Sequence, residues 1–150
     1  MAKLEGEFKV HWPIPTSEQR QQWERVTFDF KGYGSVNGNL RTTIKIAGNI
    51  YSILPIKTEG LVLDGVEILI KIPPVLKERL KTSERTHEAM EGDIIYRPQI
   101  PALSLFSDYF EIYEPVAKIG MIDRSDIPKL RKIVEEATSL MLVEVKKLEI

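Results

Sequence analysis

A long stretch of strand-like alternation, from Arg25 to Ile72, constrains the fold more than any other feature of this chain. Its apolar side chains recur at every second position, which is the period of a β-strand with one buried face. They are Val26, Phe28, Phe30 and Val36, then Leu40, Ile44 and Ile46, and finally Val66, Ile68, Ile70 and Ile72. Short turns rich in glycine and asparagine separate these runs, so we expect neighbouring strands to pair antiparallel.

The first turn fixes the predicted register. A three-residue loop at Asn37-Gly38-Asn39 places Val36 opposite Leu40, so that the apolar positions of both strands face one core. A two-residue turn at Asn37-Gly38 would mix the two faces. Because a slip of one residue moves every side chain to the other face, the three-residue loop is favoured.

Further elements complete the predicted fold. Residues 50–56 are apolar at both parities and predict a strand that is buried on both sides. A surface helix is predicted near 74–91, ended by Gly92, and a long C-terminal helix near 126–141. Residues 142–150 fit a helix or a strand. The order of these strands and helices along the chain predicts an α+β fold with a strongly curved antiparallel sheet or a small β-barrel. An OB-like arrangement is one such barrel.

Composition narrows the class of protein. The 150 residues predict a single domain, 1–150, large enough to fold without disulfides or metals. With 21 basic and 22 acidic residues, the chain does not coat nucleic acid through bulk charge, although a local basic strip is compatible. No signal peptide or membrane span is evident, and we expect a cytoplasmic protein. Eighteen isoleucines and only seven Asn and Gln indicate a thermophilic source.

A basic aromatic strip is the first candidate site. In the predicted register, Lys31 and Tyr33 share a face with Arg41 and Lys45. An aromatic ring flanked by cations is what sheet-based readers of single strands use to stack a base and hold the backbone. The four residues therefore predict a single-stranded nucleic-acid site, while an ordinary solvated hairpin face is the alternative.

The hexamer Lys31-Gly32-Tyr33-Gly34-Ser35-Val36 resembles the strand motif Lys-Gly-aromatic-Gly-aromatic-aliphatic of RNA-recognition and cold-shock domains. The resemblance covers six residues and implies that Tyr33 stacks on a base. Ser35 stands where those families place a second stacking aromatic.

Metal and catalytic chemistry have little support in the sequence. Glu84 and His87 have the Glu-x-x-His spacing of di-iron helices, but in one copy, so a solvated helix face is favoured over a metal site. No nucleophile elbow, phosphate-binding loop or dinucleotide fingerprint is present. We predict no catalytic residue, metal or cofactor, and lean against an enzyme.

A second candidate is the cluster of Phe106, Tyr109, Phe110 and Tyr113. Tyrosine combines an apolar body with a polar tip, which suits a protein interface, and burial in the chain's own core is the alternative.

The leading interpretation is a non-enzymatic interaction or assembly subunit of a thermophilic prokaryote or its virus, with a protein partner or as a homo-oligomer. A single-stranded nucleic-acid binder is the first alternative. The second is a small apolar-ligand barrel with a cavity lined by residues such as Ile53, Ile70 and Phe110.

Overall fold

The computed structural model describes residues 22–73 and 85–148, which form nine strands and two α-helices. The strands are β2 (Trp23–Phe30), β3 (Gly34–Arg41), β4 (Ile56–Leu63), β5 (Glu67–Lys71), β6 (Arg85–Ala89), β7 (Asp93–Arg97), β8 (Ala102–Phe106), β9 (Phe110–Ile122) and β10 (Met141–Lys147). The helices are α2 (Lys45–Ser52) and α3 (Ile127–Glu136), and a short 3₁₀ turn, Arg124–Asp126, leads into α3. No helix among these residues is long and apolar enough to cross a membrane.

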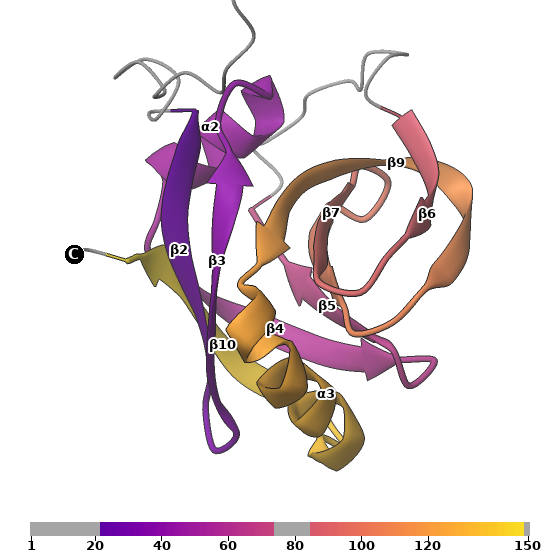
Figure 1. Ribbon diagram of the computed structural model, residues 1–150. Helices are drawn as coiled ribbons and strands as arrows, with labels where there is room; N and C mark the ends of the chain where they lie inside the picture. The colour runs from indigo at the N-terminus through magenta and orange to yellow at the C-terminus, as the bar shows by residue number, and fades with distance from the viewer. Residues whose placement is uncertain (1–21, 74–84, 149–150) are drawn as a thin grey trace, which may run out of the picture.

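All nine strands belong to one antiparallel sheet that curves into a ring (Figure 1). Their order is β3-β2-β10-β4-β5-β8-β7-β9-β6, and β3 also pairs with β9, which brings distant parts of the sheet together. The α+β class and the strongly curved antiparallel sheet are confirmed. The nine-stranded order differs from the five strands of an OB-fold.

The main core fills the inside of the ring. Alternate residues of the strands point inward, and α2 and α3 add their buried faces near the top and the bottom of the ring in Figure 1. Ile46, Ala47 and Ile50 are the buried positions of α2, and those of α3 are Ile127, Leu130, Ile133 and Val134. These spacings place the buried residues of each helix on one side.

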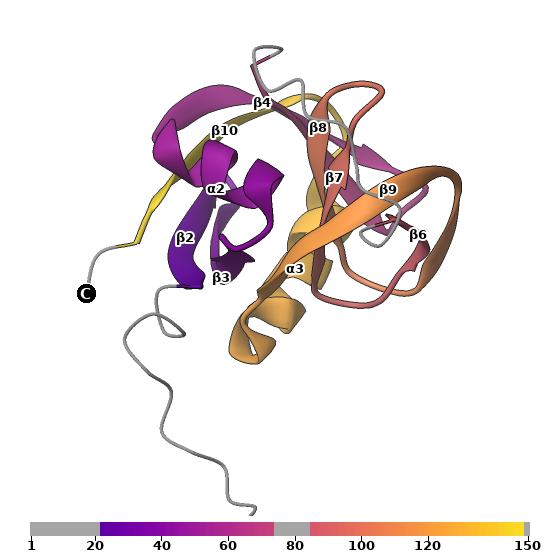
Figure 2. The same ribbon diagram turned by 90° about the horizontal axis from the view of Figure 1, so that it is seen from above.

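A smaller second core lies on the opposite face of β7 and β8. It consists of Ala89, Ile95, Phe106, Ile112 and Val116. The first half of β9 pairs with β6, and the two strands form an arm that extends away from α2 (Figure 2). The second core attaches this arm to the ring, because β6 and β9 contribute three of its five residues.

The first hairpin turns earlier than predicted. Residues 31–33 form the turn, and Phe28 lies opposite Val36. The predicted loop at Asn37-Gly38-Asn39 lies inside β3, so the predicted register is wrong. Gly32 has a φ of +87°, a left-handed conformation that glycine adopts without a steric penalty, and this favours a turn at 31–33.

Two predicted elements change type. Residues 45–52 form α2 instead of the end of a strand at 40–46, a turn at 47–49 and the start of a strand at 50–56, since a short apolar run fits either structure. Residues 85–89, in the predicted helix 74–91, form β6, because pairing with β9 buries Ala89 in the second core. Residues 74–84 lie outside the described part of the chain.

The C-terminal helix is shorter than the predicted 126–141. It ends at Glu136, and the chain returns as β10 between β2 and β4. Met141, Val143 and Val145 are buried at alternate positions, so this part of the chain has the period of a strand. Of the alternatives left open for residues 142–150, the strand is observed as far as Lys147.

Candidate functional site: two grooves at the β9 arm

The predicted basic strip is not formed. Lys31 and Tyr33 lie in the turn of the first hairpin, Arg41 at the other end of β3, and Lys45 at the start of α2. The ends of an eight-residue strand are roughly 23 Å apart. Tyr33 also packs against the main core, so its ring is partly covered. The shared face therefore does not exist, and nucleic-acid binding by these four residues stays a prediction.

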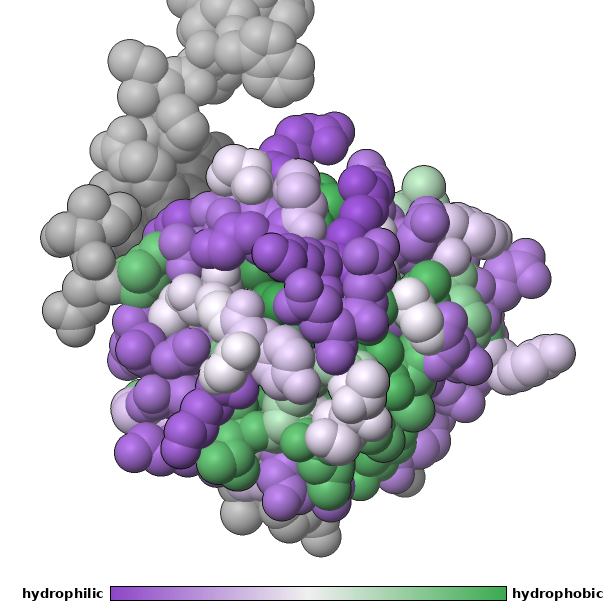
Figure 3. Space-filling view, turned by 90° about the horizontal axis from the view of Figure 1, so that it is seen from below, coloured by the Kyte–Doolittle hydropathy of each residue, from purple (hydrophilic) through white to green (hydrophobic). Residues whose placement is uncertain are grey.

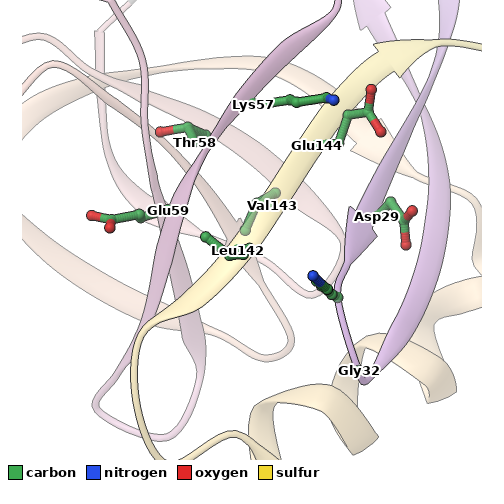
Figure 4. Close-up of a pocket in the computed structure, with 9 residues that line it drawn as sticks. Asp29, Gly32, Lys57, Thr58, Glu59, Leu142, Val143 and Glu144 are labelled. Atoms are coloured by element: carbon green, nitrogen blue, oxygen red, sulfur yellow. The ribbon is translucent and has the colours of Figure 1, made fainter.

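Lys31 instead borders a groove of about 770 Å³ on the outer face of β2, β10 and β4 (Figure 4). In the strand register, Glu144 lies opposite both Asp29 and Lys57. Across the groove the order is therefore acidic, acidic and basic, and Lys31 and Glu59 add one charge of each sign to its lining. Since opposite charges at this spacing offset each other, the groove has no uniform field for an anion.

Exposed leucines lie near that groove. Leu61 is on β4, Leu142 is on β10, and Leu140 immediately precedes β10; all three are exposed. Figure 3 shows apolar surface on the face of the molecule seen from below, next to a hydrophilic region. Apolar surface that remains in contact with water is a common feature of interaction surfaces.

The structure divides the predicted interface cluster. Phe106 is fully buried in the second core and stacks on the half-buried Phe110, with ring centroids 6.0 Å apart. Tyr109 is 46% exposed and Tyr113 is completely exposed (101%). Phe106 is therefore a core residue, while the tyrosines remain available to a partner.

The tyrosines line a groove with β6 that we call the acidic tyrosine groove. Its volume is about 890 Å³, and its residues are Thr86, His87, Glu88, Tyr109, Phe110, Glu111, Ile112 and Tyr113. Glu88 and Glu111 are directly opposite each other in the β6–β9 ladder. The Tyr109 hydroxyl lies 3.2 Å from Glu88 Oε2 and 3.3 Å from Glu111 Oε2. Partial burial, together with these two carboxylates, raises the pKa of Tyr109 above its usual value.

A buried polar network fixes the arm that carries this groove. Arg97 donates from Nε to Glu67 Oε2 at 2.8 Å and from Nη2 to Glu67 Oε1 at 3.0 Å. Its Nη1 donates to Glu114 of β9, and Ser104 donates to the same Glu67 carboxylate. The network links four neighbouring strands, β5, β8, β7 and β9.

A second groove is basic. It has a volume of about 520 Å³ and lies where β2, β3, β6 and β9 approach one another; its residues are Trp23, Arg41, Thr43, Ile44, Arg85, Thr86, Lys118, Ile119 and Gly120. Trp23 is 43% exposed and lies opposite Arg41 in the ladder. Lys118 Nζ lies 2.8 Å from Asp93 Oδ1, which holds this lysine at the groove.

Sequence reasoning found part of each groove. It identified Tyr109, Phe110 and Tyr113 from their density of aromatic rings, and Arg41 from its charge. It missed Glu88, which joins the tyrosines only because β6 pairs with β9. For Trp23, Arg85 and Lys118 the sequence holds no local signal, because three separate strands bring them together.

The helix face predicted for Glu84 and His87 is not formed by the described residues. His87 lies on the strand β6, and Glu84 is outside the described part of the chain. Within residues 22–73 and 85–148, no three His, Asp or Glu side chains group closely enough to hold a metal ion.

The residues suggested for an apolar-ligand cavity are separated. Ile70 is buried in the main core, Phe110 packs on the second core, and Ile53 is exposed just after α2. These three side chains therefore do not line one cavity.

Comparison with known proteins shows the fold alone. No family model and no curated protein matches this chain. Its structure is similar to that of McbB, solved in complex with tryptophan, with a TM-score of 0.67 and 19% identity over 81% of this chain; the match spans only 44% of McbB. It is also similar to the solution structure of the hypothetical protein AF2241 from Archaeoglobus fulgidus, with a TM-score of 0.65 and 18% identity, covering 85% of this chain and 96% of that one. The chain thus shares its fold with AF2241 and with a part of McbB that is less than half of that protein.

Proposed function

We propose that this protein is a non-enzymatic interaction or assembly subunit whose acidic tyrosine groove binds a lysine- or arginine-bearing segment of a protein partner. The observation that carries the proposal is the direct pairing of Glu88 with Glu111 beside the fully exposed Tyr113. The thermophilic prokaryotic or viral origin rests on composition and stays a prediction.

The paired carboxylates favour a cation. Like charges directly opposite each other in an antiparallel ladder destabilise the pair. The hydroxyl of Tyr109 lies near both carboxylates, but it has one proton to donate. An ammonium or guanidinium group in the groove offsets the repulsion between Glu88 and Glu111 and supplies several donors to them.

The tyrosine rings also suit a segment that carries a cation. A cation within about 6 Å of a tyrosine ring is attracted by its electron-rich face, and exposed tyrosines are common at interfaces. Tyr113 can supply this contact, because its side chain is fully exposed.

The groove is also held in place before a partner binds. Phe110 stacks on Phe106 of the second core, and Arg97 donates to Glu114 from the ring side. A pre-organised surface loses less conformational entropy on binding, which strengthens association.

The first prediction replaces the paired carboxylates. An unstructured peptide of alternating lysine and glycine serves as the probe, and its affinity is measured by isothermal titration calorimetry. Glu88→Gln with Glu111→Gln is expected to weaken binding about tenfold or more, because two charge-assisted contacts are lost. The matched control is Glu135→Gln with Glu136→Gln, which removes the same charge from the exposed face of α3 and leaves affinity close to that of the wild type.

The second prediction tests the rings and the kind of partner. Tyr113→Ala is expected to weaken binding of the same peptide about threefold, the size of a modest exposed cation–π contact. Equal affinity of the carboxylate variant and the wild type, or equal affinity for a glutamate–glycine peptide, contradicts the proposal. Light scattering shows whether the partner is a second copy of this chain or a different protein. A wild-type dimer that becomes a monomer in Tyr113→Ala would assign the groove to self-association.

A further inference from the structure

We infer that the basic groove formed by Trp23, Arg41, Arg85 and Lys118 is a separate site for a nucleotide unit, with the base on Trp23 and the phosphate on the cations. This site is distinct from the acidic tyrosine groove. Of the four residues predicted to bind nucleic acid, it contains Arg41.

Charge is the first argument. The chain as a whole carries a formal net charge of −1, yet three cations and no carboxylate are among the described residues that line this groove. The nearby carboxylate of Asp93 pairs with Lys118, whose ammonium group has further donors to offer. Arg41 is exposed and has no ion-pair partner within residues 22–73 and 85–148. A local positive field on a nearly neutral protein selects an anion.

The exposed tryptophan is the second argument. Trp23 is 43% exposed although it belongs to a paired strand. Stacking on an aromatic side chain stabilises a bound base by about 1–3 kcal/mol, whatever the base. Arg41 lies directly opposite Trp23 in the ladder, so the ring and the cation are neighbours, as a nucleotide requires.

The size of the groove is the third argument. About 520 Å³ lies within the roughly 300–1,000 Å³ typical of small-ligand sites. A nucleotide unit comes either from a free nucleotide or from a single strand, and both present the same ring and phosphate. The two sources are separated by experiment.

The test uses the full chain with Trp12→Phe, so that Trp23 is the only tryptophan, and follows its fluorescence. The probes are adenosine monophosphate and a six-residue oligothymidylate at low salt. We expect quenching by a probe, with affinity that falls as salt increases. If the mononucleotide quenches the fluorescence with the same affinity as the oligonucleotide, the ligand is a free nucleotide. If only the oligonucleotide quenches it, the ligand is a single strand. No quenching by either probe overturns the inference.

Two matched variants localise the site. Arg41→Gln is expected to weaken binding about tenfold, because one charge-assisted phosphate contact is lost. Lys31→Gln removes another exposed cation, at the other end of the β2–β3 hairpin, and should leave affinity unchanged. Equal weakening by the two substitutions would indicate diffuse attraction and overturn the inference. Both positions are exposed, and thermal denaturation checks that both variants are folded.

Discussion

Replacing Arg97 with methionine is expected to lower the free energy of unfolding by about 3–5 kcal/mol. The loss is large because Glu67 is only 1% exposed and accepts both of its guanidinium hydrogen bonds from Arg97. Without Arg97, the Glu67 carboxylate is buried with Ser104 as its remaining described donor. A buried charge that has lost its partner costs more than the original pair contributed.

Urea denaturation measures this loss, and two further variants interpret it. The double variant Glu67→Gln with Arg97→Met removes both charges and is expected to recover most of the lost stability. Arg131→Met is the control for a surface pair: Arg131 and Glu91 are both exposed, so its cost should be about 1 kcal/mol or less. If Arg97→Met costs no more than Arg131→Met, the buried network does not stabilise the fold.

The same substitution connects stability to the proposed function. Arg97 also donates a hydrogen bond to Glu114, which directly follows Tyr113 of the acidic tyrosine groove in β9. Arg97→Met therefore removes a hydrogen bond that holds the β9 arm immediately beside the groove. It should also weaken binding of the lysine–glycine peptide, because the groove is then less pre-organised.

Local patterns were sufficient for part of the fold. The alternation of Ile68 and Ile70 was predicted, and both isoleucines are buried in the main core. The prediction that Val26 and Phe28 share the buried face was also right, although the residues predicted opposite them were not. Burial depends on the period of one strand, whereas register depends on how two strands align.

The register could not be predicted because one glycine has a nonlocal role. Gly38 looks like a turn residue, but a Cβ at this position would lie 2.6 Å from the backbone oxygen of Met121 in β9. Glycine is needed there so that β3 can approach β9, a strand more than 80 positions away in the chain. No pattern around residue 38 carries that information.

The candidate grooves also depend on contacts between residues that are distant in sequence. Tyr109 and Tyr113 are close in sequence and were found together, whereas Glu88 reaches them through the β6–β9 ladder. That ladder replaced a predicted helix, since the pairing of a strand within a sheet outweighs local propensity. Both grooves depend on contacts made by β9, so the position of this strand decides which residues meet.

Gly120→Ala is expected to lower the free energy of unfolding by about 3 kcal/mol, the upper part of the usual range for overpacking. Gly120 lies opposite Leu40 where β3 and β9 pair. An added Cβ would overlap the backbone oxygen of Asn39 and lie 3.2 Å from the Leu40 Cα. These are backbone atoms of a paired strand, so relief requires β3 and β9 to separate.

Gly32→Ala is the matched control. Gly32 has a φ of +87°, but an added Cβ there has no described atom within 4 Å, so the substitution should cost only about 1–2 kcal/mol for the left-handed conformation. Urea denaturation compares the two variants, and hydrogen exchange of the β3 amides reports whether the strands have separated. Because Gly120 also lines the basic groove, Gly120→Ala should weaken binding of the nucleotide probe where Gly32→Ala does not. Equal stability of the two variants, with β3 still protected, would show that the β3–β9 pairing tolerates a side chain and does not hold the ring together.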